Sequence, residues 1–468
     1  MPTYIDLFAG CGGLSLGLEK AGFELLLAVE KSPMAAETYY HNFIEPIVNL
    51  QDWEEYLSSQ IEKQFSTGLI VEELVAVLRN EKIMNHLRHT EVDLVVGGPP
   101  CQGFSLAGRR DPTDERNQLP WQFLDFVEAV MPKAVLMENV IGMNRNFSKH
   151  DTKAPFELLQ IELSKLGIGY DVQPVELNAM HYGIPQHRPR VMLLAVRKGI
   201  TSNRKELFSQ NIWKSEHERD SLLIRPKIVP KITHFGQIIR RVRDAFWDID
   251  DNGYIDNELN EYTKIMRSPE CWSFARNRHI HTLPNHNLRN HTSRVTSRFR
   301  LYQYLVSQGI SPNTVNIPSK KNLEYEDKIS ILQSIYDGVD LPALSPDEEK
   351  IGNTIDELIE LTFALKTKKH SQRPLDLLKP SPTILSIPDD FVHPTSPRTL
   401  TVREMARLQS FPDAFEFRSK ETTGSKRRKF EVPQYTQVGN AVPPLLAFHI
   451  GKNFAHILEH SKDMINIS

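Results

Sequence analysis

Cys101 lies in the segment Gly-Gly-Pro-Pro-Cys-Gln-Gly-Phe-Ser at residues 97–105, where its neighbours favour chemistry over packing. The two prolines end any preceding strand and fix the backbone just before the cysteine. The glycines on both sides allow the loop to move. Because a free thiol has a pKa of about 8.5, a nucleophile here requires surroundings that favour the thiolate. The segment therefore predicts a presented cysteine nucleophile.

Three further residues could handle a proton or an anion: Glu138, Arg188 and Arg190. Glu138 follows an apolar run, and a carboxylate at the end of a buried strand is costly unless it is used or paired. Burial should raise its pKa, which would make it a proton donor near neutral pH. Arg188 and Arg190 alternate, so they should point to one face, where guanidinium groups can hold a carboxylate, a phosphate or a base.

A glycine-rich turn, Asp-Leu-Phe-Ala-Gly-Cys-Gly-Gly at residues 6–13, precedes a helical pattern. Glycines at a strand-to-helix turn let a ligand approach the backbone. Glu30 ends the next apolar run, and an acid there typically binds both hydroxyls of a ribose. Turn and acid together predict an adenosine-containing cofactor, with a plain tight turn as the alternative. Ser15 stands where a dinucleotide-binding motif needs glycine, which favours S-adenosylmethionine over a nicotinamide cofactor.

These residues must be positioned by the elements that alternate along the first 200 residues. Short runs that are apolar on both faces predict parallel strands covered by helices, at residues 4–8, 25–29, 92–96, 134–137 and 191–196. Helical spacing lies between them, for example at residues 14–21 and 121–130. We therefore predict an α/β fold with a doubly wound, mostly parallel sheet, whose ligands bind at the carboxyl ends of the strands.

The alternation of strand and helix patterns ends near residue 200, which predicts a second, smaller domain. We assign residues 1–200 to a catalytic and cofactor-binding domain and residues 201–425 to the second domain. Within the latter, residues 201–390 are irregular and rich in charge. Thr401 and Glu404 have the spacing of a helix capping box, in a helix that should end before Pro412. Residues 426–468, with a helix at about 443–459, should return to the first domain.

Charge restricts the class of protein. A net charge of −3 excludes a wholly basic nucleic-acid coat protein but not a local basic face. Residues 271–300 contain six arginines and four histidines but no acidic residue, a pattern that suits a phosphate backbone. We select Arg276, Arg278 and Arg298 as candidates for DNA contact. The alternative is a solvated surface whose arginines pair with acids elsewhere.

The cysteines indicate the compartment. Three cysteines at wide spacing exclude a disulfide framework and favour a reducing cytosol. We expect no secretory leader and no membrane-spanning segment. Cys271 has histidines nearby but no Cys-x-x-Cys partner, so we expect no metal. Cys11 we interpret as packing in the turn.

In their order along the chain, these segments resemble the DNA cytosine-5 methyltransferase family of bacterial restriction-modification systems. The matching segments are residues 6–13, 30, 97–105, 138–140, 186–190, 398–413 and 437–443. Residues from about 200 to 390 match nothing that we can name. That gap fits the family, whose variable target-recognition region lies at this place.

The resemblance implies a mechanism. Cys101 would add to C6 of cytosine, and Glu138 would bond the N3/N4 edge and protonate N3. Arg188 would hold the base and support Glu138, while Arg190 would help to orient the group. The base would be flipped out of the duplex, and a mobile loop at residues 102–117 would close on it with Gln102 and Ser105 against the DNA.

The resemblance also implies how S-adenosylmethionine is held. The residues expected around it are Phe8, Gly10, Gly12, Glu30, Asp52, Pro100, Leu119 and Asn440. Glu30 would take the ribose, Asn440 the methionine end and Asp52 the adenine amino group, although the sequence around Asp52 departs from the family pattern. The expected partner is double-stranded DNA at one short sequence, alongside a restriction endonuclease. We expect a cytoplasmic, nucleoid-associated monomer.

Three rival functions are open at this stage. Ser15 and the Pro-Cys-Gln loop count against a nicotinamide oxidoreductase. A tRNA cytosine methyltransferase of the same fold would have a shorter variable region with a Cys-Phe-Thr segment, which is absent. A DNA-binding protein without catalysis is disfavoured because every catalytic position is filled.

Overall fold

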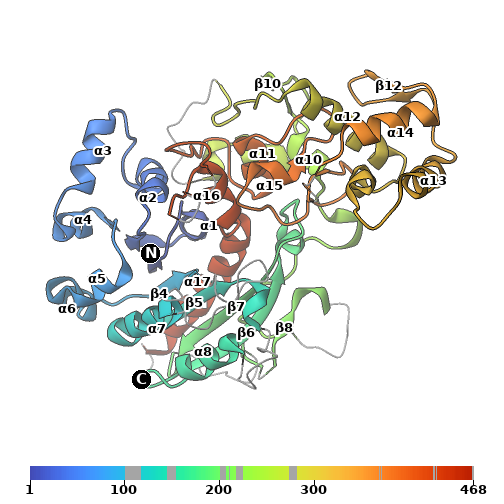
Figure 1. Ribbon diagram of the computed structural model, residues 1–468. Coiled ribbons are helices and arrows are strands. Elements are labelled where there is room, and N and C mark those ends of the chain that lie inside the picture. Colours follow the sequence, from blue (N-terminus) through green and yellow to red (C-terminus); the bar gives the residue numbers. More distant parts are fainter. Residues whose placement is uncertain are drawn as a thin grey trace.

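The computed structural model describes residues 1–100, 118–144, 154–200, 207–209, 211–217, 225–272, 282–367, 369, 371–424, 427 and 430–465. An eight-stranded sheet lies at its centre, in the order β3-β2-β1-β4-β5-β7-β6-β8 (Figure 1). Its strands are β1 (Thr3–Leu7), β2 (Glu24–Val29), β3 (Leu69–Ile70), β4 (Leu94–Gly97), β5 (Ala134–Asn139), β6 (Tyr170–Asn178), β7 (Pro189–Arg197) and β8 (Trp213–Lys214).

The first five strands run parallel, and four of them are strands that the sequence predicts as parallel; β3 was not predicted, and the predicted parallel strand at residues 191–196 is the antiparallel β7. β7 is antiparallel to both β5 and β6, and β8 is parallel to β6. The mostly parallel sheet confirms the predicted α/β fold. Because the carboxyl ends of β1 to β5 meet at one edge, the residues that follow these strands are gathered there.

Helices cover both faces of the sheet. Tyr4 and Leu94 point into a core with residues of α1 (Gly13–Lys20) and α17 (Pro444–Ile465). Ile5 and Val95, one residue further along each strand, point into a second core with residues of α7 (Leu119–Val130) and α8 (Pro155–Leu163). Since successive side chains alternate across a strand and both faces are covered, these strands are apolar throughout.

Several helices lie between the strands of the amino-terminal half. They are α2 (Pro33–Tyr39), α3 (Leu50–Leu57), α4 (Ile61–Thr67), α5 (Leu74–Arg79) and α6 (Glu81–Arg88). A single turn of π-helix continues α2 over Tyr40–Ile44. α3 and α4 lengthen the connection between β2 and β3, so β3 lies further along the chain than strand-helix alternation alone would place it.

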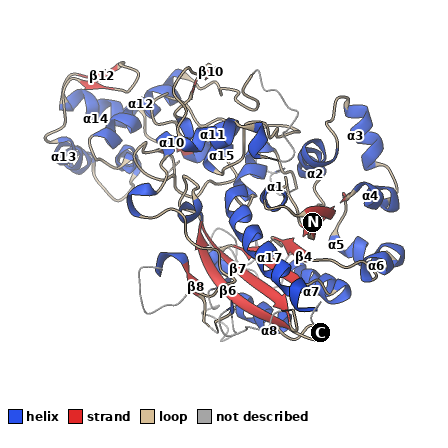
Figure 2. Ribbon diagram, turned by 180° about the vertical axis from the view of Figure 1, so that it is seen from behind, coloured by secondary structure: helices blue, strands red, loops and turns tan. Residues whose placement is uncertain are grey.

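A separate helical core lies in the second half of the chain. Phe299, Leu332 and Leu358 share it, and they come from α12 (Ser293–Ser307), α13 (Tyr325–Tyr336) and α14 (Ile355–Ala364). Both ribbon views place these helices at the opposite end of the molecule from α3 to α6 (Figures 1 and 2). The hairpin of β11 (Ala343–Leu344) and β12 (Lys350–Gly352) belongs to this core. The other short elements of this half are α10 (Val242–Phe246), β9 (Ile249–Asp250), β10 (Gly253–Tyr254), α11 (Glu261–Arg267), β13 (Arg373–Pro374) and β14 (Phe391–Val392).

Two short helices lie between the helical core and the sheet: α15 (Val402–Leu408) and α16 (Gln434–Asn440). The predicted capping box of α15 is confirmed, because Thr401 Oγ1 accepts from Glu404 N–H and Glu404 Oε2 accepts from Thr401 N–H. Among the described residues, no helix combines the length and the apolar character needed to cross a membrane.

Candidate active site

Glu138 and Arg190 meet at the ends of two neighbouring strands. Glu138 is near the end of β5, and Arg190 is near the start of the antiparallel β7. Arg190 Nε lies 3.0 Å from Glu138 Oε1, and both side chains are about nine-tenths buried (11% and 12% exposed). Burial raises the pKa of Glu138, and the charges of Arg190 and Arg188 oppose that rise. The site thus holds a buried carboxyl group that is paired with one guanidinium.

The loop that leads into Cys101 rests directly on this carboxyl group. A Cβ on Gly98 would lie 2.9 Å from Glu138 Oε2, so only glycine fits there without displacing the carboxylate. Asn139, the last residue of β5, donates from Nδ2 to the carbonyl oxygen of Pro99 at 3.0 Å. Pro100 is exposed and is the last described residue before the gap. Cys101, with Gln102 and Ser105, lies outside the described residues.

Arg188 has a different environment from the one expected. Its side chain is buried, and its Nη atoms donate to the backbone carbonyls of Ile384, Gly439 and Ala441 at 3.2, 2.8 and 3.0 Å. Its Nε has no hydrogen-bond partner in the described part of the chain. The direct contact with Glu138 is therefore made by Arg190, while Arg188 acts on this carboxyl group through its charge.

Two buried glutamines complete the same framework, and sequence reasoning did not single them out. Gln186 donates to Gln409 Oε1 at 2.9 Å, and its own Oε1 accepts from the backbone N–H of Ile384 at 2.9 Å. Gln409 donates to the carbonyl of Val438 at 2.8 Å. A buried amide is costly unless it is hydrogen-bonded.

The glycine-rich turn after β1 has the geometry of a ligand cradle. Phe8 and Gly10 both have φ of 58°, and Gly12 has φ of 96°. A non-glycine residue such as Phe8 in this region is strained, and such strain clusters at functional sites. A Cβ on Gly10 would meet nothing within 4 Å, so space beside this backbone is open to a ligand, whereas one on Gly12 would strike the ring of Phe43.

Glu30 joins this turn to the end of β2. Its two carboxylate oxygens accept from the backbone N–H groups of Gly10 at 2.9 Å and of Ser32 at 2.7 Å. Burial raises the pKa of Glu30, while these backbone donors oppose the rise. A carboxylate beside an open glycine backbone fits the ribose of S-adenosylmethionine.

The end of α16 reaches the same turn. Cys11 is buried, with its thiol 3.7 Å from the carbonyl of Gln437, and a Cβ on Gly13 would lie only 2.3 Å from the carbonyl of Val442. Asn440 lies between these two contact points and is exposed. Leu119, the first residue of α7, is partly exposed. The structure thus brings Asn440 to the glycine turn across the whole length of the chain.

Asp6 and Ser15 lie behind the turn and were missed as functional candidates. Ser15 donates to Asp6 Oδ2 at 2.7 Å and hydrogen-bonds the hydroxyl of Tyr39 at 2.8 Å. Asp6 is fully buried, and its Oδ1 has no partner among the described residues. Burial raises the pKa of Asp6 to about 7, against the hydrogen bond from Ser15. Ser15 therefore connects Asp6, before the turn, to Tyr39 through its hydroxyl group. It has this structural role in addition to replacing the glycine of a dinucleotide-binding motif.

The placement of Asp52 differs from the expectation. Asp52 is exposed in the first turn of α3, within the connection between β2 and β3. An acid that contacts adenine is expected directly after a strand beside β2, and β3 is that strand. The acids that follow β3 are Glu72 and Glu73, and Glu73 pairs with Lys31 at 3.0 Å. Glu72 is therefore a second candidate for the adenine contact, beside Asp52.

The candidate DNA-contacting arginines are also revised. Arg276 and Arg278 lie outside the described residues. Arg298 is buried on α12, where its Nη2 contacts Gln372 Oε1 at 3.4 Å, so it does not present a surface to DNA. Arg289 and Arg300 of the same basic segment pair with Asp389 and Asp347. For these two, the alternative of arginines paired with acids elsewhere is confirmed.

Comparison with known proteins covers almost the whole chain. The family model for C-5 cytosine-specific DNA methylase matches residues 3–456. The type II methyltransferase M.DdeI of Desulfomicrobium norvegicum is 29% identical over 97% of this chain and 89% of its own. M1.HphI, a type II methyltransferase of Haemophilus parahaemolyticus, is 29% identical over 95% of this chain and 84% of its own.

A solved structure supports the fold. It is described as a DNA modification methyltransferase encoded within a prophage (E. coli), and it matches with a TM-score of 0.51 at 24% identity, over 98% of this chain and 100% of that chain. The family match extends from β1 into α17 and so includes every segment that forms the site. The chain therefore belongs to the C-5 cytosine-specific DNA methylase family, whose reaction transfers a methyl group from S-adenosylmethionine to carbon 5 of cytosine in DNA.

Proposed function

We propose that Cys101, Glu138 and Arg190 carry out this reaction and that Arg188 positions them. The observation that carries the proposal is the Glu138–Arg190 pair, which lies against the backbone of residues 98 and 99 just before Cys101. A nucleophile and a proton donor must both reach one cytosine ring, and this loop anchor keeps them close.

The Cys101 thiolate adds to C6 and forms an S–C6 bond. The electron pair of the C5–C6 double bond shifts toward C4, and N3 takes a proton from Glu138. The resulting enamine is nucleophilic at C5. S-adenosylmethionine, when bound, supplies the methyl group that C5 accepts. The C5 proton then leaves to a base as the S–C6 bond breaks, N3 returns its proton to Glu138, and the Cys101 thiolate is regenerated. Arg190 holds the Glu138 carboxyl group in place throughout.

Phe8, Gly10, Gly12, Glu30, Pro100, Leu119 and Asn440 would surround the cofactor. Glu30 would exchange its backbone donors for the ribose hydroxyls, and the open space beside Gly10 would admit the ligand. Glu72 would take the place proposed earlier for Asp52. Calorimetric titration with S-adenosylmethionine tests this choice: Glu72→Ala should weaken binding and Asp52→Ala should not. The opposite ranking would return the role to Asp52.

The type II names of the relatives support a narrower proposal about the DNA. The enzyme would methylate one cytosine in a short double-stranded sequence, flipped from the helix at a cost of a few kcal/mol. Residues 201–390 would select the sequence, and a restriction endonuclease of the same specificity would be its functional partner. We infer that the protein acts as a monomer in the cytoplasm, at the nucleoid.

The test is to incubate the protein with S-adenosylmethionine and DNA that carries no 5-methylcytosine, followed by bisulfite sequencing. Methylation is expected at one short motif, and Cys101→Ala and Cys101→Ser should abolish it. A duplex with 5-fluorocytosine at the mapped position should form a covalent complex only when Cys101 is present. Methylation that persists in either Cys101 variant would overturn the mechanism.

A further inference from the structure

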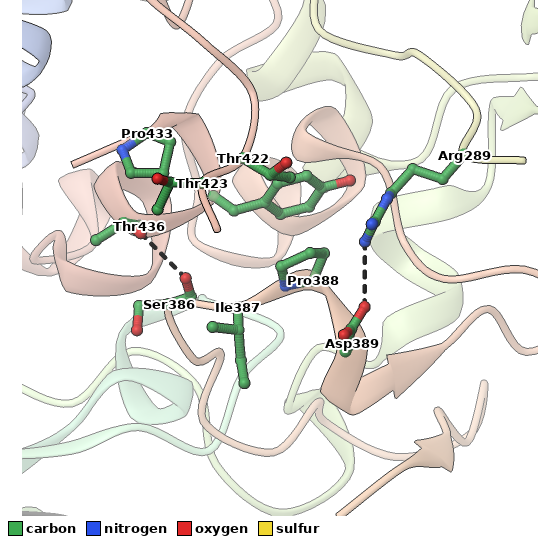
Figure 3. Close-up of a pocket in the computed structure, with 10 residues that line it drawn as sticks. Arg289, Ser386, Ile387, Pro388, Asp389, Thr422, Thr423, Pro433 and Thr436 are labelled. Atoms are coloured by element: carbon green, nitrogen blue, oxygen red, sulfur yellow. Dashed lines mark hydrogen bonds and ion pairs between the residues drawn. The ribbon is translucent and has the colours of Figure 1, made fainter. Parts of the chain in front are cut away.

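A cavity of about 80 Å³ lies where three distant segments of the chain meet (Figure 3). Arg289 supplies a guanidinium group to its wall, and four serine or threonine side chains line it: Ser386, Thr422, Thr423 and Thr436. Tyr435 lines it as well, but its hydroxyl donates to the carbonyl of Leu400. Hydroxyl groups and a guanidinium are the side chains that most often bind a phosphate of the DNA backbone. The chemistry of the wall therefore points to an oxyanion as its ligand.

Some of the polar groups in this wall make no hydrogen bond to the described part of the protein. Within the described residues, the hydroxyl groups of Ser386 and Thr422 have no hydrogen-bond partner. Thr436 donates to the carbonyl of Ser386 at 3.1 Å, and Thr423 donates to Glu431, which also pairs with Lys420. Two hydroxyl donors and one guanidinium are thus available to a ligand.

The guanidinium is held by an acid that has a second cation. Arg289 Nη1 lies 3.2 Å from Asp389 Oδ1, and Lys369 Nζ lies 3.0 Å from Asp389 Oδ2. Burial would raise the pKa of Asp389, but Lys369 and Arg289 lower it, so the carboxylate is charged. These three groups carry one net positive charge. Arg289 can therefore leave Asp389 for a phosphate without stranding an unpaired carboxylate, because Lys369 stays.

The cavity lies beside the active site. Ile384 accepts from Arg188, and Ser386, two residues later, contributes to the cavity wall. Two extended residues span at most about 7 Å. Thr436 and Asn440 belong to the same short helix, α16. A DNA strand that enters the active site therefore passes close to the cavity.

We propose that this cavity, the Arg289 pocket, binds a backbone phosphate of the DNA near the target nucleotide. Arg289 exchanges Asp389 for the phosphate, Ser386 and Thr422 donate to it, and Lys369 retains Asp389. The proposal rests on DNA being the substrate, and it adds a contact that the sequence motifs do not contain. It also predicts opposite effects for the two members of one ion pair.

The experiment measures binding of a short fluorescent duplex by anisotropy over a range of salt concentrations, with S-adenosylmethionine present. Arg289→Gln should weaken binding about ten-fold at low salt, the size expected for one charged hydrogen bond. It should also reduce the slope of log affinity against log salt by about 0.9, the value for one phosphate contact. Asp389→Asn should strengthen binding, because it releases Arg289.

Arg300→Gln is the matched control, because Arg300 also pairs with one aspartate, Asp347, and has a similar exposure of 28% against 30% for Arg289. It should leave the affinity and the salt slope unchanged. Melting temperature and S-adenosylmethionine affinity, measured on every variant, separate a lost contact from a misfolded protein.

Several results would overturn the proposal. Equal affinity and salt slope for Arg289→Gln and wild type would do so, as would a weakening of binding by Asp389→Asn as large as that by Arg289→Gln. Titration with inorganic phosphate that saturates the wild type but not Arg289→Gln, with DNA binding unchanged, would assign the pocket to a free anion. Wild-type protein that methylates no DNA would instead reject the proposed function, so the two failures are distinguishable.

Discussion

The side-chain amide of Asn139 donates a hydrogen bond of 3.0 Å to the carbonyl oxygen of Pro99, which ties the end of β5 to the loop that leads into Cys101. Asn139 also accepts from the backbone N–H of Val140 at 2.9 Å. Its neighbour in sequence is Glu138. One strand end thus supplies both the proposed proton donor and the anchor for the nucleophile loop.

Asn139→Ala should slow methyl transfer without weakening cofactor binding. The carbonyl of Pro99 would lose its buried donor, and the loop would hold Cys101 less accurately. A misplacement of about 1 Å can cost roughly a hundred-fold in rate, so we expect kcat to fall about ten- to a hundred-fold. Single-turnover methylation and S-adenosylmethionine calorimetry check this. Unchanged turnover would show that the anchor is dispensable.

Gly98→Ala should impair catalysis because the new Cβ would lie 2.9 Å from Glu138 Oε2 and push the carboxylate aside. Gly424→Ala is the control, since a Cβ there would meet nothing within 4 Å. We expect the first variant to fold and to lose at least about ten-fold in kcat, and the second to match the wild type. Equal activity of both variants would contradict the geometry.

Conservative changes should separate the two arginines. Arg190→Lys keeps a charge beside Glu138 but loses the guanidinium group that holds the carboxyl group in place. It should therefore lower kcat while leaving cofactor affinity intact. Arg188→Lys lacks the planar fork whose two Nη atoms span the three carbonyl oxygens, and two of those carbonyls, of Gly439 and Ala441, flank Asn440. It should therefore weaken S-adenosylmethionine binding by about ten-fold or more. Calorimetry together with steady-state kinetics distinguishes these effects, and identical profiles would argue against separate roles.

Asp6→Asn should flatten the dependence of stability on pH. The pKa of Asp6 is raised to about 7 by burial, so the folded state binds this proton more tightly than the unfolded state does. The contribution of Asp6 to the free energy of unfolding is therefore largest below the ordinary carboxyl pKa, and a few kcal/mol of it are lost as pH rises through about 7. Urea unfolding of both proteins between pH 4 and 8 measures the difference. A parallel pH dependence in the variant would refute the assignment.

Arg407→Met should destabilise the protein strongly. Arg407 is fully buried between Asp248 at 2.5 Å and Asp413 at 2.6 Å, so its loss removes the cation from Asp413 and leaves Asp248 with Arg267 at 3.4 Å. Breaking such a buried network costs about 3–5 kcal/mol in the free energy of unfolding. Arg300→Met, at an exposed pair, should cost no more than about 1 kcal/mol. Urea denaturation compares them, and similar losses would show that burial is unimportant here.

The central sheet was predictable because both of its faces are covered, so the strands from Tyr4 to Val96 read as apolar runs. β6 was not predicted, because Asp171, Gln173 and Glu176 interrupt its pattern. β3 is only two residues long. The helical core of α12 to α14 was not predicted, because the basic residues of α12 indicate a surface that faces DNA. In the structure one of them, Arg298, packs inward.

In the site, types of residue were easier to predict than their partners. The sequence pattern indicates that Glu138, Arg188 and Arg190 belong together, but alternation along a strand does not say which arginine meets the carboxyl group. The position of Asp52 on an exposed helix was not predictable, because α3 and α4 lengthen the chain before β3. The role of Ser15 depends on Tyr39 from another helix, and spacing within one segment contains no such information.

Gly13 meets the backbone of Val442, and Gly17 lies against that of Pro444 with room for no side chain. The first glycine turn of the chain is therefore finished by residues synthesised more than four hundred positions later. A nascent chain on the ribosome has no complete cradle until α16 and the start of α17 have emerged. Methylation is thus withheld until α16 and the start of α17 have been translated, and fragments that stop before α16 should be inert competitors at most.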